Sequence, residues 1–520
     1  MTITELQQQY AAHPNTAVME RLLKDASVQT IFCGGLCASS ASLFSSVLVK
    51  QDVCPFVFVL GDLEEAGYFY HDLTQVLGTE KVLFFPSSFR RSIKYGQKDA
   101  ANEILRTEVL SRLQKGEEGL CIVTYPDALA EKVVSRKELS DKTLKLNVGE
   151  KLDTTFITDV LHSYGFEYVD YVYEPGQYAV RGSIIDVFSF ASEYPYRIDF
   201  FGDEVESIRT FEVESQLSRE RKQGVAIVPD LAVTGDVTTS FLDFIPKETV
   251  LAMRDFLWLR ERIQVVHDEA LTPQAIAVQE AEENGGITLE GKLIDGSEFT
   301  VRALDFRRME FGNKPTGTPD AKISFHTSVQ PIFHKNFDLV AGSFKDYLEQ
   351  GYSLYICSDS TKQTDRIRAI FEDRGDKIQF TPVVRTIHEG FVDHTLHLCI
   401  FTDHQLFDRF HKYNLKSDKA RSGKVALSLK ELNQFTPGDY VVHTDHGIGR
   451  FSGLVRIPNG DTTQEVLKLV FQNEDVVFVS IHSLHKVSKY KGKDGEAPRL
   501  NKLGTGACLL YTSPSPRDTR

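Results

Sequence analysis

Short apolar stretches alternate with helical patterns through the first 140 residues, and this alternation constrains the fold more than any other feature of the sequence. The expected strands are Thr30–Cys33, Pro55–Leu60, Lys81–Phe85 and Leu120–Thr124. The segments between them space their apolar residues as helices do, at Ala41–Lys50, Leu63–Leu77 and Asp99–Leu113. Strand–helix alternation of this kind predicts a mostly parallel α/β sheet.

The rhythm changes near residue 145, where one expected helix, Thr155–Tyr164, is followed by closely spaced strands. The strands predicted there are Tyr168–Tyr173, Ala179–Arg181, Ser183–Phe190, Tyr196–Phe201 and Glu204–Val213. Gly202-Asp203 between the last two is typical of a two-residue hairpin turn. We therefore expect a small α+β module over residues 144–227, inserted after an α/β domain at 1–143.

The rest of the chain divides into further segments. We expect residues 228–330 to continue the first α/β domain and residues 331–410 to form a second, small α/β domain, with a strand at Phe337–Val340. A basic linker at 411–433 precedes four short strands over 434–495, whose regular turns predict a small β-barrel. We expect residues 496–507 to begin a connecting segment after the barrel. Residues 508–520 resemble translated adapter sequence, so we expect a non-native tail there.

Composition excludes several classes of protein. The net charge of −14 over 520 residues argues against general electrostatic binding to nucleic acid or to an anionic membrane. No apolar window approaches the 18 or more residues of a membrane span. Seven scattered cysteines make a disulfide framework unexpected, so we expect a cytoplasmic protein.

A degenerate phosphate loop follows the first expected strand. Phosphate loops need the pattern GxxxxGK[ST], because backbone amides hold the phosphates and the lysine balances their charge. Here Ser40 stands at the second glycine and Ala41 at the lysine. We expect the loop to be non-functional; the residues concerned are Gly35, Ser39, Ser40, Ala41 and Ser42.

The hairpin at 196–213 carries a candidate interface. Strand alternation places Arg197, Asp199 and Phe201 on one face, and arginine beside an aromatic residue is typical of interface hot spots. The alternative is that Phe201 belongs to the core and Arg197 pairs with Asp199 or Glu204. The residues alone leave both interpretations open.

Two further patterns are weaker. His443/His446 and His482/His485 form two HxxH pairs, which would suit a zinc site but which also occur by chance at surface turns. Lysines and arginines gather at 411–433 and 486–502, where a solvated linker is the simpler interpretation and a phosphate contact the alternative.

Two long motifs carry a resemblance. The segment YVYEPGQYAVRGSIIDVFSFASEYPYRIDFFGDEVESIRTFEVESQLS resembles the UvrB-homology module of the bacterial transcription-repair coupling factors (the Mfd family). FTPGDYVVHTDHGIGRFSGLVRI with VFVSIHSLHKVSKY resembles their RNA polymerase-interacting domain, which is similar to CarD-type and Tudor-like barrels. Residues 401–424 resemble Bacteroidetes members, and RLNKLGTGA resembles the segment leading to the motor of that family.

The resemblance implies an α/β multidomain fold: a degenerate UvrB-like, RecA-like parallel sheet, an α+β UvrA-binding module, a small α/β domain and a Tudor/CarD-like barrel. It implies binding to the RNA polymerase β subunit, at positions matching Ile457 and Phe478, and recruitment of UvrA, at Arg181, Arg197 and Phe201. The family's DNA contacts, ATP, Mg²⁺ and ATP-driven translocation belong to motor domains beyond this sequence. We expect this chain to hold no cofactor and to hydrolyse no ATP.

Two other functions stay open from the sequence. One is a nucleotide-hydrolysing repair enzyme of the UvrB or helicase type, which an intact GK[ST] loop would support. The other is a free-standing CarD-like transcription regulator, which the motif at 171–218 disfavours.

Overall fold

The computed structural model describes residues 1–88, 100–213, 215–231, 237–272, 289, 291–411, 413, 436–443, 446–459, 462–480, 487–490 and 500. The chain separates into two compact units, one of residues 1–143 and 228–415 and the other of residues 144–227 and 416–520. Nearly all of the predicted basic linker and connection, and the whole tail from 508, lie outside the described residues.

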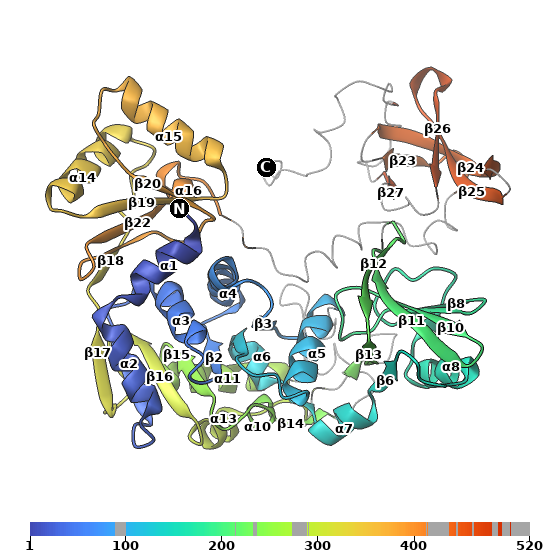
Figure 1. The fold of residues 1–520 in the computed structure, drawn as a ribbon, viewed down its shortest axis with the longest axis horizontal. Coiled ribbons are helices and arrows are strands. Elements are labelled where there is room, and N and C mark those ends of the chain that lie inside the picture. The colour runs from blue at the N-terminus through green and yellow to red at the C-terminus, as the bar shows by residue number, and fades with distance from the viewer. Residues whose placement is uncertain are drawn as a thin grey trace. The chain divides into compact units, whose positions relative to one another are not determined.

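A seven-stranded parallel sheet forms the centre of the first unit (Figure 1). Its spatial order is β17-β1-β16-β15-β2-β4-β3. The strands are β1 (Thr30–Gly34), β2 (Phe56–Val59), β3 (Val82–Phe85), β4 (Cys121–Thr124), β15 (Val250–Met253), β16 (Arg307–Gly312) and β17 (Ala321–Ser324). Strands from before and after the 144–227 segment therefore belong to one sheet, with β1 lying between β17 and β16. The predicted α/β fold with a parallel sheet is confirmed.

The helices of this sheet begin where the sequence supplies a capping residue. Asp62 accepts a hydrogen bond from the Glu65 amide at the start of α4 (Leu63–Leu77), and Asp255 accepts one from the Trp258 amide at the start of α11 (Phe256–Ala270). The other helices and short strands around the sheet are α1 (Ile3–Ala11), α2 (Pro14–Lys24), α3 (Ser40–Lys50), α5 (Ala100–Gln114), α6 (Pro126–Ala130), α7 (Arg136–Asp141), α10 (Phe241–Phe244), α13 (Gly296–Ala303), β5 (Val133–Val134) and β14 (Val237–Thr239).

A smaller five-stranded sheet, of order β18-β21-β22-β19-β20, follows in the same unit. Its elements are β18 (Thr327–Val329), α14 (Phe337–Glu349), β19 (Ser353–Ser358), α15 (Thr361–Asp373), β20 (Thr381–Val384), β21 (Phe391–Asp393), β22 (Leu398–Thr402) and α16 (Asp403–Leu406). The strand predicted at Phe337–Val340 is wrong, because this segment is the first turn of α14. Asn336 caps it, accepting from the Asp338 and Leu339 amides.

The 144–227 module is built on a six-stranded sheet of order β12-β11-β10-β9-β8-β7, mostly antiparallel. Helix α8 (Thr154–Ser163) buries Ile157 and Leu161 in the same cluster as Ile185, Ile198 and Ile208 of the sheet. The strands are β6 (Leu144–Asn147), β7 (Glu167–Tyr168), β8 (Gln177–Arg181), β9 (Ile184–Val187), β10 (Tyr196–Phe201), β11 (Glu204–Phe211), β12 (Ser218–Lys222) and β13 (Gly224–Ile227), of which β6 and β13 pair separately.

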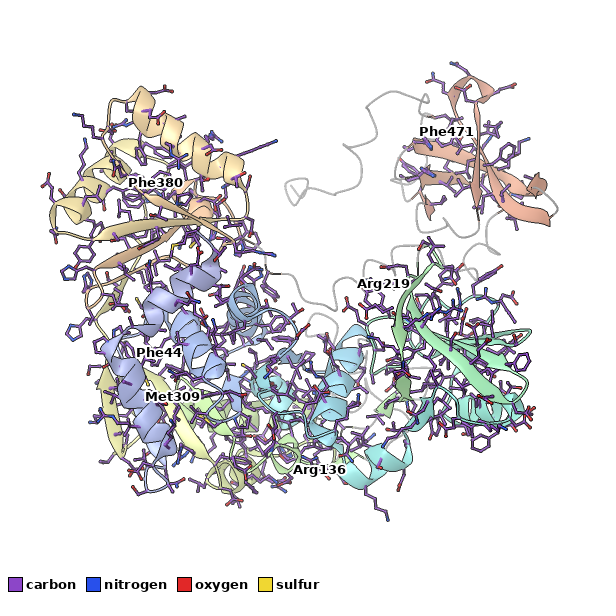
Figure 2. The ribbon with its side chains drawn as sticks, in the orientation of Figure 1. Phe44, Arg136, Arg219, Met309, Phe380 and Phe471 are labelled. Atoms are coloured by element: carbon purple, nitrogen blue, oxygen red, sulfur yellow. The ribbon has the colours of Figure 1, made fainter. Side chains whose placement is uncertain are left out.

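The C-terminal sheet is antiparallel, with the order β26-β25-β24-β23-β27. Its strands are β23 (Tyr440–His443), β24 (Gly447–Asn459), β25 (Thr462–Val470), β26 (Val476–Ser480) and β27 (Val487–Lys489), with a 3-10 turn at Gln472–Glu474. Its core includes Val441, Phe451 and Phe471, the last labelled in Figure 2. Over the residues that the structure describes, no helix is long and apolar enough to cross a membrane.

Candidate functional site

The degenerate phosphate loop lies where a working loop would lie, between β1 and α3. Gly35 adopts a φ of +85°, in the left-handed region that glycine tolerates best. A Cβ at Gly35 would overlap the carbonyl oxygen of Phe325, so another part of the chain already fills the space beside the loop. Phe325 also donates its amide to the carbonyl oxygen of Gly34 at 2.7 Å.

Polar groups of the loop are bound by the same chain. Thr327 Oγ1 donates to the Gly35 carbonyl oxygen at 2.7 Å and accepts from the Cys37 amide at 3.1 Å, and Ser40 Oγ accepts from that amide at 2.9 Å. Ser39 Oγ accepts from the Glu389 amide at 2.9 Å. The Cys37 amide, a donor of the kind that holds phosphate oxygens in a working loop, therefore already has internal partners.

A buried carboxylate, that of Asp72, binds the start of the helix that follows this loop. Asp72 of α4 accepts from Ser42 Oγ at 2.7 Å and from the His388 amide at 2.7 Å. Burial raises the pKa of Asp72 to about 6, although these hydrogen bonds act in the opposite direction. The adjoining cavity, of about 340 Å³, is also lined by Asp62, Glu64, Glu65 and Glu389, with Arg254 paired to Glu65 at 2.7 Å. Most of the charged side chains that line this cavity are therefore carboxylates.

Four histidines of the first unit form a cluster near Asp72, and no local sequence pattern predicts this cluster. The rings of His404 and His411 stack at 4.5 Å, and His71 meets His411 edge to face at 5.0 Å. His388 stacks on Tyr68 with ring centroids 3.4 Å apart. Burial, reinforced by neighbouring imidazoles, lowers the pKa of His71, His388 and His404 to about 4.

The candidate interface of the module is organised around a carboxylate that the sequence pattern does not indicate. Asp186 of β9 has a fully buried side chain and binds two arginines. Arg197 Nε donates to Asp186 Oδ1 at 2.8 Å and Arg197 Nη2 donates to Asp186 Oδ2 at 2.9 Å, while Arg181 also donates to Oδ2. Strand pairing thus brings Arg181 and Arg197 together on one carboxylate.

The third predicted residue, Phe201, lies open on this sheet. Ile198 and Phe200 of β10 are buried, whereas Phe201 is 81% exposed. The alternative that Phe201 belongs to the core is therefore wrong. The alternative that Arg197 pairs internally holds, but its partner is Asp186 rather than Asp199 or Glu204. Arg197 also donates to the Gln216 carbonyl oxygen at 3.1 Å and lies 4.5 Å over the ring of Phe211.

The two positions expected to contact RNA polymerase lie on the two strands that flank β25 in the C-terminal sheet. Phe478 of β26 is 51% exposed and pairs opposite Lys468. Ile457 of β24 pairs opposite Gln464, and its side chain lies outside the described residues. Within the described residues β24 pairs with β23 only at 447–450, so Ile457 has a strand neighbour on one side.

The zinc hypothesis finds no support in the described part of the chain. His443 and His446 stack with ring centroids 4.6 Å apart, whereas His482 and His485 lie outside the described residues. Among described residues no group of three or more histidine, cysteine, aspartate or glutamate side chains has a metal-binding arrangement.

Two family models match the chain. The UvrB interaction domain matches residues 144–232, which include Asp186 and the three predicted interface residues. The CarD-like/TRCF RID domain matches residues 435–491, which include Ile457 and Phe478.

Curated relatives match over most of the chain. The transcription-repair-coupling factor of Staphylococcus aureus (strain bovine RF122 / ET3-1) is 24% identical in an alignment covering 90% of this chain and 46% of the relative. That of Bacillus subtilis (strain 168) is 22% identical with the same coverage. The chain thus spans about half the length of the curated relatives it matches. The predicted resemblance is confirmed: the chain is related to the transcription-repair-coupling factors.

Proposed function

We propose that this chain couples transcription to DNA repair by binding the β subunit of stalled RNA polymerase and recruiting UvrA. The observation that carries the proposal is Phe201, an exposed aromatic ring in a segment similar to the UvrB interaction domain. An exposed phenylalanine loses little conformational entropy on binding and buries a large apolar area, which is why aromatic residues often dominate interfaces.

The UvrA contact rests on a preorganised site. Asp186 fixes Arg181 and Arg197 before any partner arrives, so little side-chain entropy remains to be lost on association. Arg181 keeps about a third of its side chain exposed and is available to a carboxylate of the partner, whereas Arg197 is mostly covered. We therefore propose that Phe201 and Arg181 touch UvrA directly, with Arg197 beneath them.

Titration of UvrA with the wild-type chain and with Phe201→Ala tests this proposal. We expect Phe201→Ala to weaken binding by about 2 kcal/mol. Phe156→Ala is the matched control, because Phe156 is an exposed phenylalanine on α8 of the same module. Equal affinity of all three proteins for UvrA would contradict the proposed surface.

For RNA polymerase, we propose a contact through β24 and β26 that includes Ile457 and Phe478. A strand with an open side can add to a sheet of the partner, while neighbouring apolar side chains supply buried area. Pull-down of the isolated β lobe should recover wild type but not Ile457→Arg or Phe478→Arg, because each places an unpaired charge in the contact. Ile332→Arg, at an exposed position of the first unit, is the control. Recovery of Ile457→Arg and Phe478→Arg at the wild-type level would exclude this surface.

We further propose that the first unit is a degenerate UvrB-like domain that holds no nucleotide, and that DNA translocation, ATP and Mg²⁺ belong to motor domains outside this chain. The internal partners of Gly35, Cys37 and Ser39 disfavour a nucleotide-hydrolysing enzyme. Calorimetry with Mg-ATP should detect no binding to wild type, nor to Ala41→Lys, because restoring the lysine leaves the loop filled. A micromolar dissociation constant for wild type, about −8 kcal/mol, would overturn this proposal.

The second candidate, a free-standing CarD-like regulator, accounts for residues 435–491 but not for the match at 144–232. The proposed function also places the protein in the cytoplasm, where RNA polymerase and UvrA are found in bacteria.

A further inference from the structure

We infer that the UvrA-binding site of the module extends beyond Arg181, Arg197 and Phe201 along a row of arginines, and that this row binds a carboxylate-rich surface of UvrA. The row consists of Arg197, Arg209 and Arg221 and is called the arginine row below. The inference rests on the proposed function and adds to it two residues, Arg209 and Arg221, together with the charge of the partner surface.

Strand register places these arginines directly opposite one another. Asp186 of β9 faces Arg197 of β10, which faces Arg209 of β11, which in turn faces Arg221 of β12. Directly opposed residues of antiparallel strands project to the same face, with Cα atoms about 4.5–5.5 Å apart. The face concerned is the one away from Ile198 and Ile208, whose side chains lie in the core with α8.

Neighbouring arginines in such a row repel one another. Carboxylates offset this repulsion at some positions of the row but not at all of them. Asp186 binds Arg197, and Asp199 binds Arg209 and also accepts from Ser207 Oγ at 2.8 Å. Arg221 is exposed and has no ion-pair partner within the part of the chain that the structure describes. With Arg181 included, four arginines share this face with Asp186, Asp199 and Glu204, and Glu204 stands opposite Phe201, far from β12 along the hairpin. The positive charge that no described carboxylate binds therefore lies at the β12 end of the face, at Arg221.

Other charged residues of β12 are already engaged. Arg219, labelled in Figure 2, pairs with Glu212 and lies 4.1 Å over the ring of Tyr194. Lys222 binds Glu220 at 2.8 Å and stands opposite the core residue Ile208, on the other side of the strand. Arg221 is thus the charged group of β12 that a partner meets without first breaking an ion pair.

The surroundings of the row favour an acidic protein over nucleic acid. Two exposed apolar side chains accompany it: Phe201, on the same face of β10, and Leu217, which follows the Gln216 that binds Arg197. Asp199 lies on this face as well and would repel a phosphate backbone. Apolar area beside interspersed charges of both signs suits a protein surface, where arginine binds carboxylates in a planar, two-pronged geometry.

Charge reversal at Arg221 tests the inference with little risk to folding, because the side chain is exposed and forms no ion pair with any described residue. UvrA is titrated with the full chain as wild type, Arg221→Glu and Lys222→Glu. We expect Arg221→Glu to weaken UvrA binding about tenfold and to flatten its salt dependence, because a long-range attraction becomes a repulsion. Lys222→Glu makes the same charge change on the opposite side of β12 and should bind UvrA within about twofold of wild type.

The outcomes separate this inference from the function on which it rests. If wild type does not bind UvrA, the proposed function fails. If wild type binds and Phe201→Ala weakens binding while Arg221→Glu does not, the function stands and the extended row is wrong. If Arg221→Glu instead lowers affinity for a short DNA duplex and leaves UvrA binding unchanged, the row is a nucleic-acid contact and our assignment is overturned.

Discussion

The β1–α3 loop of the first unit and the face of the module that carries Arg181 and Arg197 are both polar sites. They differ in what the internal hydrogen bonds of their polar groups do. In the loop, Thr327, Ser40 and the backbone of Phe325 take up the groups that a ligand would need. On the module, Asp186 holds arginines in place from below, while Phe201 stays open. Internal hydrogen bonds thus occupy the polar groups of the loop, whereas on the module they hold the arginines in place. The two sites differ because only the module keeps an exposed side chain, Phe201, for a partner.

Removing the buried anchor of the module should have the largest effect. Asp186→Ala leaves Arg197, whose side chain is only 14% exposed, without its carboxylate. An uncompensated buried charge costs about 3–5 kcal/mol, and we expect a loss of local stability of that size. Hydrogen exchange of the amides in β8, β9 and β10 measures it.

Asp199→Ala provides the comparison for that substitution, because Asp199 and Arg209 are both more exposed than Asp186 and Arg197. Its effect on the same amides should be clearly smaller. Equal exchange rates in Asp186→Ala and wild type would mean that the arginines do not depend on this anchor.

A side chain at Gly35 should destabilise the filled loop by a somewhat smaller amount. Alanine there would take a φ of +85° and its Cβ would overlap the Phe325 carbonyl oxygen, so the backbone must shift. We expect a cost of about 2–4 kcal/mol from strain and overpacking. Urea unfolding followed by Trp258, the single tryptophan of the chain, reports on this unit. Gly342→Ala, at a helical glycine with open space around it, is the control.

Mild acid should weaken the first unit through its histidines. His71, His388 and His404 have pKa values near 4 in the folded chain, below the value of about 6.5 expected when unfolded. Their contribution to stability is therefore complete only above the unfolded pKa, and it is lost as the pH falls from there toward 4. Asp72 acts in the opposite sense, because its pKa is raised to about 6 and its protonation favours the folded state.

The balance of these groups predicts a net loss of about 1–2 kcal/mol between pH 7 and pH 6. Urea unfolding followed by Trp258 fluorescence at the two pH values measures it. His71→Asn together with His404→Asn should flatten the pH dependence. A first unit that is equally stable at both pH values would show that the cluster does not titrate as its burial requires.

Local patterns predicted several elements of both regions, but the strand expected at Tyr168–Tyr173 is wrong, because the strand there is β7, which ends at Tyr168. Helix α4 and strand β10 have the bounds that periodicity indicates, and the exposed face of β10 follows from simple alternation. Strands β15, β16 and β17 were not predicted as members of the first sheet. Their pairing with β1 and β2 joins segments on either side of the module, and no local pattern carries such long-range information.

For the candidate sites too, local patterns predicted some features, whereas features that depend on long-range contacts were not predicted. The missing lysine at Ala41 predicted a non-functional loop, but the filling of that loop by Phe325 and Thr327 depends on residues nearly 300 positions away. Asp186 was missed because it stands in an apolar strand, where a single carboxylate gives no periodic signal. Only the register of β9 against β10 brings it to Arg197.

The smallest change in stability that we predict is at Phe201. It is best compared with the change at Phe211, a second phenylalanine of the same hairpin. Phe201 is 81% exposed, so Phe201→Ala should change the free energy of unfolding by less than about 0.5 kcal/mol. Phe211 is fully buried in a cluster with Val172 and Phe188 and lies under Arg197, so Phe211→Ala should cost about 3–5 kcal/mol. Hydrogen exchange of β10 and β11 in the two variants separates an open interface residue from a core residue. If Phe201→Ala loses as much protection from exchange as Phe211→Ala does, Phe201 is a core residue and does not belong to the UvrA-binding surface.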